Sequence, residues 1–225
     1  MCRLHSDVRL LFAVPDHPWR RCYGWLQEAE RSPADEPALK AKVVAALQFR
    51  PDPGDPHLTP DDRALLAASL IRLGELESGL TYLAHDWSQA PPAAAGLAGT
   101  TLLHLGLIAM AAEALRQAAS DPTCSPALRI NHGRALLLSG EPEAALGELE
   151  QGAAGLPGHS LAQLSVSEAL LALGEVERAL ARLPEDSRDE QLIGARVRLL
   201  GAASRHEEAS QLLTRARREH PDSLG

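Results

Sequence analysis

Several residue types that would mark a specific class of protein are scarce in this sequence. Aromatic residues make up 3% of the 225 residues, and the three cysteines are odd in number and too few for a disulfide framework. No apolar run approaches the roughly eighteen residues that a transmembrane helix needs. The apolar stretch at 10–14 is too short for the core of a secretory signal peptide. These absences predict a cytoplasmic protein without membrane insertion.

Basic residues are also in deficit. The formal net charge is -8 at pH 7, and because residues 1–60 hold equal numbers of acidic and basic side chains, the whole excess lies in 61–225. Binding to nucleic acid through its phosphates requires a basic surface, so we expect no nucleic-acid partner. Arginine outnumbers lysine twenty to two, a bias that weakly favours a GC-rich, bacterial origin.

What the sequence does contain is a repeat rich in leucine and alanine. A glycine that follows a leucine-rich segment recurs at Gly74, Gly106, Gly140 and Gly174, and a leucine precedes each by four residues. Five residues after each glycine stands a small residue, with a leucine four further on: Gly79 and Leu83, Ala111 and Leu115, Ala145 and Leu149, Ala179 and Leu183. A fifth copy is plausible around Ala209, between Leu200 and Leu213, with Ser204 in place of the glycine.

A period of about 33 residues with these columns predicts stacked helical hairpins. Glycine can end the first helix of each hairpin in the left-handed backbone conformation. The small residue lets the second helix approach the first closely, and the leucine four positions on lies on the same helical face. Prolines then stand where a second helix should stop, at Pro91, Pro122, Pro157 and Pro221.

The repeats resemble the tetratricopeptide repeat (TPR) family. The resemblance rests on the small residues Ala67, Gly99, Gly133, Ser167, Ala111, Ala145, Ala179 and Ala209, on Pro157 and Pro221, and on the segments "SGEPEAAL" (139–146) and "LGEVERAL" (173–180). It covers about 60–221 and implies an all-α fold: a right-handed superhelical α-solenoid of stacked antiparallel helix hairpins. The copies depart from the family pattern near the start of the first helix, where Arg63, Ala95, Arg129 and Gln163 replace a bulky aromatic residue. An Ala/Leu-rich bundle without true repeats is the alternative.

The sequence divides into four segments. Residues 1–18 form an N-terminal arm or capping segment, in which 6–14 fits either a short helix or an extended arm. Residues 19–52 are a diverged helical hairpin, and 53–60 are a proline-rich linker. The TPR-like array of about five hairpins occupies 61–225, with Thr59 or Asp61 capping its first helix.

The sequence indicates no active site and no cofactor. The opening "MCRL" resembles the start of class II glutamine amidotransferases, in which Cys2 would be the N-terminal nucleophile, but the likeness ends at Leu4. Cys2, His5, His17 and Cys22 have spacings that zinc accepts, although free cysteines and surface histidines are the more ordinary interpretation. Phosphate-cradling, dinucleotide-binding and nucleophile-elbow motifs are absent from the sequence. We therefore predict neither catalysis nor a metal site.

The TPR resemblance implies instead a concave groove lined by the first helix of each hairpin. By that resemblance, the groove residues are Arg72, Thr100, His104, Asn131, Arg134, Glu168 and Arg198. Arg72, Arg134 and Arg198 would lie along one groove and could pair with a carboxylate or an acidic peptide segment. The expected function is a non-enzymatic scaffold or adaptor that binds a protein or peptide partner. Self-assembly into a homo-oligomer, and a metal-binding or N-terminal-cysteine enzyme, are the alternatives.

Overall fold

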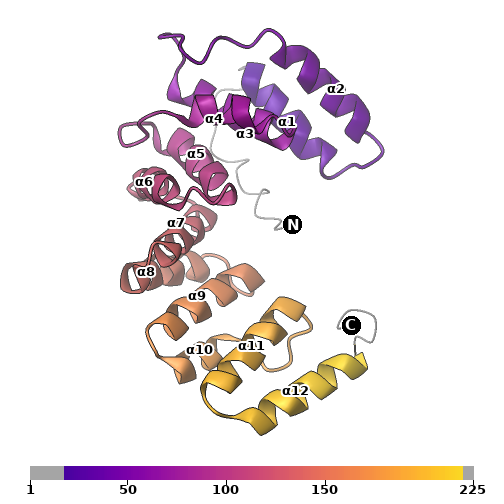
Figure 1. Cartoon of the computed structure of the whole chain (residues 1–225), viewed down its shortest axis with the longest axis vertical. Coiled ribbons are helices and arrows are strands. Elements are labelled where there is room, and N and C mark those ends of the chain that lie inside the picture. Colours follow the sequence, from indigo (N-terminus) through magenta and orange to yellow (C-terminus); the bar gives the residue numbers. More distant parts are fainter. Residues whose placement is uncertain (1–17, 220–225) are drawn as a thin grey trace. The chain divides into compact units, whose positions relative to one another are not determined.

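A computed structural model describes residues 18–219, and every regular element in that range is an α-helix (Figure 1). The helices are α1 (Pro18–Ala29), α2 (Glu36–Leu47), α3 (Pro60–Arg72), α4 (Leu76–Leu83), α5 (Pro92–His104), α6 (Ile108–Ala119), α7 (Pro126–Leu138), α8 (Pro142–Ala154), α9 (Ser160–Ala172), α10 (Val176–Arg182), α11 (Glu190–Ala202) and α12 (His206–Glu219). The predicted all-α fold is confirmed. None of the described helices is both long and apolar enough to cross a membrane.

The helices belong to two compact units, and the border between them falls within α7, between Asn131 and His132. In the first unit α1 packs on α2 and on α3, α3 packs on α4 and α5, and α5 packs on α6. In the second unit α9 packs on α8, α10 and α11, and α11 packs on α10 and α12. Both units are therefore built from antiparallel hairpins whose neighbours in sequence are neighbours in space.

The four repeat glycines end helices as the sequence predicts. Gly74, Gly106, Gly140 and Gly174 all have positive φ, between 74° and 89°. In the first copy the Gly74 amide donates to Ile71 O at 3.0 Å and the Glu75 amide donates to Leu70 O at 2.9 Å. This pair of bonds is the Schellman motif, which satisfies carbonyls that the end of a helix would leave unpaired. The motif turns the chain from the first helix of a hairpin into the second.

The fifth copy uses the same turn without a glycine. Ser204 has φ 59° and is the single residue other than glycine with positive φ in the described range. Its amide donates to Gly201 O at 3.0 Å, and the Arg205 amide donates to Leu200 O at 2.8 Å. The backbone therefore repeats the Schellman geometry at a position where a side chain makes that conformation costly.

The columns of small residues and leucines form the seams between the two helices of each hairpin. Ala111, Ala145 and Ala179 are fully buried, and so are Leu115 and Leu149. A Cβ added to Gly99 would lie 2.6 Å from Leu115 Cγ, and one added to Gly133 would lie 2.5 Å from Leu149 Cγ. These distances are shorter than carbon–carbon contacts allow, so the seams favour glycine at these two positions.

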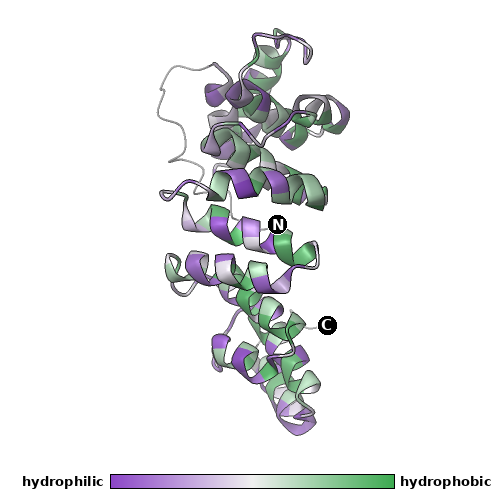
Figure 2. Ribbon diagram, turned by 90° about the vertical axis from the view of Figure 1, so that its left-hand side faces the viewer, coloured by the Kyte–Doolittle hydropathy of each residue, from purple (hydrophilic) through white to green (hydrophobic). Residues whose placement is uncertain are grey.

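Local signals fix where the helices begin. Proline occupies the first turn of α3, α5 and α8, where its missing N–H costs nothing. Thr59 caps α3 with a full capping box: the Asp62 amide donates to Thr59 Oγ1 at 3.2 Å, and the Thr59 amide donates to Asp62 Oδ2 at 3.0 Å. Of the two capping residues proposed from sequence, Thr59 is the one that the structure uses. Most helices carry both hydrophobic and hydrophilic stretches, as helices with a buried and an exposed face should (Figure 2).

Candidate protein-binding surface

Three of the seven residues proposed for a groove lie in the second unit, at one equivalent position of successive first helices. They are Arg134 on α7, Glu168 on α9 and Arg198 on α11. Glu168 and Arg198 are exposed, and Arg134 is half-buried. The equivalent residues of the first unit, Ala68 and Thr100, are buried. The second unit alone therefore presents charge at this position.

The charges on α9 and α11 meet in a weak ion pair. Arg198 Nη2 lies 3.8 Å from Glu168 Oε1, and both side chains are largely exposed. An ion pair of this kind contributes about 0–1 kcal/mol because water screens it and two long side chains lose rotamer freedom. A partner could exchange this contact for one of its own at little cost.

Arg134 carries the unpaired charge of the group. Among the residues that the structure describes it has no hydrogen bond or ion pair, whereas most other arginines of the second unit are paired with a carboxylate. A guanidinium offers five N–H donors in a planar fork that fits a carboxylate. Arg134 is therefore ready to bind a carboxylate from outside.

The surroundings of these charges are partly apolar. Each first helix presents one stripe of exposed or half-buried residues on the same side as its charge. The stripes together are called the first-helix surface of the second unit: Arg134 and Leu138 of α7, Leu164, Glu168, Leu171 and Ala172 of α9, and Gly194, Arg198, Gly201 and Ala202 of α11. Apart from the backbone of α11 and the adjoining residues, nothing lies within 4 Å of where a Cβ of Gly194 or Gly201 would stand, so no other element covers α11 at these two positions.

Two proposed groove residues, Thr100 and Asn131, do not face the solvent, and that expectation is wrong. Both are buried, and Asn131 Nδ2 donates a hydrogen bond to Thr100 Oγ1 at 3.2 Å. The cause lies in the packing of the first helices, which have neighbours on two sides. The residues equivalent to Asn131 in the other hairpins, Leu65, Leu97, Ser165 and Ala195, are all buried too. The pair is an internal polar contact that joins α5 to α7.

Arg72, another proposed groove residue, has partners within the chain at the contact between α1 and α3. Its side chain is 12% exposed, its Nε lies 3.7 Å from Glu30 Oε1, and its guanidinium carbon lies 4.6 Å from the centre of the Tyr23 ring. A cation over an aromatic face is attracted to it. His104 is exposed at the end of α5. The first unit thus offers one of its four proposed residues.

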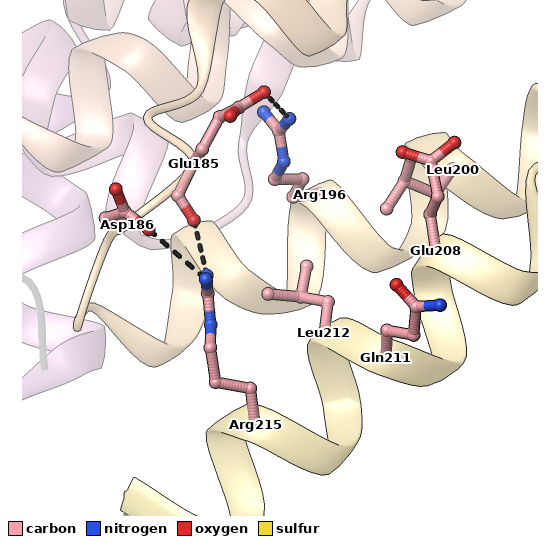
Figure 3. Close-up of a pocket in the computed structure, with 8 residues that line it drawn as sticks. All are labelled: Glu185, Asp186, Arg196, Leu200, Glu208, Gln211, Leu212 and Arg215. Atoms are coloured by element: carbon pink, nitrogen blue, oxygen red, sulfur yellow. Dashed lines mark hydrogen bonds and ion pairs between the residues drawn. The ribbon is translucent and has the colours of Figure 1, made fainter.

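The second unit also has a charged hollow of about 410 Å³ beside α11 and α12 (Figure 3). Its arginines are paired within the chain. Arg196 donates to Leu180 O, Leu183 O and Glu185 Oε1 at 3.1, 2.9 and 2.8 Å. Arg215 donates to Glu185 O at 2.7 Å and to Asp186 Oδ1 at 3.2 Å. The hydrogen bond from Arg205 holds the pKa of the Glu208 carboxyl below its ordinary value. Helical periodicity could not reveal this cluster, because two of its carboxylates, Glu185 and Asp186, come from the loop between α10 and α11.

The residues proposed for a zinc site or an N-terminal nucleophile, Cys2, His5 and His17, lie outside the described residues. Cys22 is described: it is buried in α1, and burial raises the pKa of its thiol despite the nearby Arg21. A buried thiol held in its neutral form is a poor nucleophile and a poor metal ligand. Within residues 18–219 no three His, Cys, Asp or Glu side chains are grouped as a metal ion would require.

Comparison with known proteins identifies the fold. No family model and no curated protein matches the chain. Two crystal structures of a kinesin light chain-like protein from Podosopora anserina, described by its nearly identical TPR-like repeats, do match. One is 17% identical and covers 92% of this chain and 97% of its own, and the other is 16% identical and covers 94% and 100%; the TM-score is 0.53 for both. The chain therefore has the TPR-like helical repeat fold that its repeats predict.

Proposed function

We propose that this protein is a non-enzymatic interaction scaffold that binds a protein or peptide partner on the first-helix surface of the second unit. The observation that carries the proposal is a row of charged residues at equivalent positions of α7, α9 and α11, all of them exposed or half-buried. Arg134, the first of them, has no hydrogen bond or ion pair among the described residues. TPR-like repeats generally mediate contacts between proteins. We place this activity in the cytoplasm of a bacterium, on the composition alone.

The chemistry of this surface favours a segment with both carboxylates and apolar side chains. Arg134 can receive a carboxylate, and Arg198 can do so when it releases Glu168. Leu138 is an exposed large apolar side chain, and Leu171 is half-buried near it in the repeat register. Removing such side chains from water contributes about 25 cal/mol per Å² of apolar area. The small residues on α11 let a backbone approach closely.

An affinity capture from host lysate tests the proposal. The bait is the full chain, compared with the double variant Arg134→Glu/Arg198→Glu. The matched control is Arg116→Glu/Arg178→Glu, which makes the same change of charge at two exposed arginines on second helices. We expect a protein that both the wild type and the control retain and that the first variant loses, with dissociation at least about tenfold faster. A partner that all three baits hold equally would contradict the proposed surface.

A further inference from the structure

The charges of the first-helix surface alternate in sign. Arg134, Glu168 and Arg198, together called the charge row, stand at one equivalent position of α7, α9 and α11, so their order is positive, negative, positive. Glu168 is the one charged residue in the whole of α9. A helix whose sequence is otherwise neutral thus places a carboxylate between two guanidinium groups. Such an order of charges is a feature by which a surface can select a complementary partner.

Contacts within the chain leave the charge row accessible. Arg198 Nη2 and Glu168 Oε1 are 3.8 Å apart, which is too long for a hydrogen bond, and the two side chains are 62% and 45% exposed. An exposed pair of this kind adds little to stability. Arg134 has no hydrogen bond or ion pair among the described residues. All three charged groups can therefore turn to a partner without breaking a strong contact.

We infer that the charge row receives one extended segment of another protein, which presents an acidic, a basic and an acidic side chain, in that order and three residues apart. The inference rests on the proposed function of the same surface. The two carboxylates of the segment meet Arg134 and Arg198, and its cation meets Glu168. The weak contact between Arg198 and Glu168 is then replaced by two contacts with the partner.

The spacing of three residues follows from the distance between neighbouring first helices. α9 packs directly on α11, and packed helices lie about 8–10 Å apart. α7 precedes α9 by one repeat, and stacked repeats keep the same step. A polyproline II segment advances about 9 Å in one turn of three residues, so it brings a side chain to the same face at each first helix. A β-strand repeats its face after two residues, or about 7 Å, and would be out of step by the third helix.

The order of charges also disfavours a second copy of this chain as the occupant. In a two-fold dimer that brings the charge row onto itself, Arg134 of each copy would face Arg198 of the other, and the two Glu168 side chains would face each other. All of these contacts join like charges, which oppose association. A segment with the complementary order is attracted at all three positions instead.

Binding of labelled synthetic peptides to the full chain, followed by fluorescence anisotropy at low salt, tests the inference. The probe is Asp-Pro-Leu-Lys-Pro-Leu-Asp, in which proline favours the polyproline II conformation. The matched control is Pro-Leu-Asp-Lys-Asp-Pro-Leu, which has the same composition and net charge but carries its charges on consecutive residues. We expect the wild type to bind the probe at least about fivefold more tightly than the control.

Reversing the charges of the protein should reverse its preference. Arg134→Glu/Glu168→Arg/Arg198→Glu should bind Lys-Pro-Leu-Asp-Pro-Leu-Lys at least about fivefold more tightly than the probe, whereas the wild type should prefer the probe. The formal net charge of the chain is -8, so its overall field would favour the more basic peptide and cannot cause the wild-type preference. Arg116→Glu/Arg178→Glu, at two exposed arginines of second helices, is the matched control and should keep that preference.

Three results would overturn the inference. In the first, the wild type binds the probe and the control peptide equally. In the second, the charge-reversed protein, folded by circular dichroism, keeps the wild-type preference. In the third, sedimentation shows a dimer of the wild type that Arg134→Glu/Arg198→Glu abolishes, which would assign the charge row to a second copy.

The lysate capture separates a failure of this inference from a failure of the proposed function. A captured partner that Arg134→Glu/Arg198→Glu loses, together with peptides that show no preference, would keep the proposed surface and reject the order and spacing of its ligand's charges. The absence of both the partner and the peptide preference would reject the surface and the inference together.

Discussion

The seam between α7 and α8 gives a prediction whose sign can be worked out from the structure. Replacing Gly133 with alanine adds a Cβ that would lie 2.5 Å from Leu149 Cγ, 2.9 Å from Leu149 Cδ2 and 3.0 Å from Ala145 O. The first of these atoms is the branch point of a buried side chain and the last belongs to the backbone, so neither can move away freely. Overpacking of this kind costs about 1–3 kcal/mol.

Alanine also forms helix better than glycine, by about 1 kcal/mol, so the two effects oppose each other at Gly133. We expect the packing cost to win and Gly133→Ala to lower the free energy of unfolding by about 1 kcal/mol. Gly194 supplies the matched control, because it lies inside α11 of the same unit and a Cβ there would meet nothing within 4 Å. Gly194→Ala should therefore raise the free energy of unfolding by about 1 kcal/mol.

Urea unfolding, followed by circular dichroism at the helical band, measures both variants against the wild type. With a slope of about 2 kcal/mol per M, the two midpoints should differ by about 1 M, with the wild type between them. If Gly133→Ala stabilised the protein as much as Gly194→Ala, the close approach of α7 and α8 at Gly133 would be refuted. So would the register of the repeats, which places this residue at the seam.

Three further substitutions test other contacts. Ser204→Gly should stabilise the protein by about 1 kcal/mol, since Ser204 has φ 59° and a side chain is costly in that conformation; a lower urea midpoint would contradict this. Arg196→Met should lower the free energy of unfolding by about 2 kcal/mol and speed amide exchange in α10, because the Arg196 side chain, 13% exposed, donates to two carbonyls at the end of that helix. Unchanged amide exchange in α10 would contradict this. Burial lowers the pKa of His85 below its ordinary 6.5, with Arg63 adding to the effect, so the unfolded state binds the proton more readily and stability falls as the pH drops below 6.5. His85→Asn should flatten that part of the profile of unfolding free energy against pH, and an unchanged profile would show that His85 is not its source.

The repeat architecture could be predicted because each of its requirements acts locally. A left-handed helix end selects glycine at Gly74 and Gly174, and a close helix–helix contact selects a small residue at Ala145 and Ala179. These demands recur at a fixed spacing, so they are visible in the sequence. Even Ser204 was recognisable, because its neighbours Leu200 and Ala209 keep the register.

The binding surface was harder to predict because exposure depends on partners that are distant in sequence. Arg72 is covered by Tyr23 and Glu30, which belong to a hairpin that lacks the repeat signature. The sequence predicted that Asn131 is a polar surface residue, but it is buried and donates a hydrogen bond to Thr100, which lies 31 residues earlier in the sequence. Periodicity assigns a residue to a helix face, but it does not say how many neighbours that face has. Arg134, Glu168 and Arg198 keep their proposed role in the second unit, and it awaits experiment.

The central proposal, that the first-helix surface of the second unit binds a partner, is tested most directly by site-specific photocrosslinking. p-Benzoylphenylalanine would replace Ala172, which is exposed on α9 one turn after Glu168, and in a parallel sample Ala181, which is exposed on α10. The proposal predicts that the probe at 172 crosslinks to a specific protein in host cells, that the probe at 181 does not, and that Arg134→Glu removes the product. Equal crosslinking from both positions, or a product that Arg134→Glu leaves unchanged, would contradict the proposal.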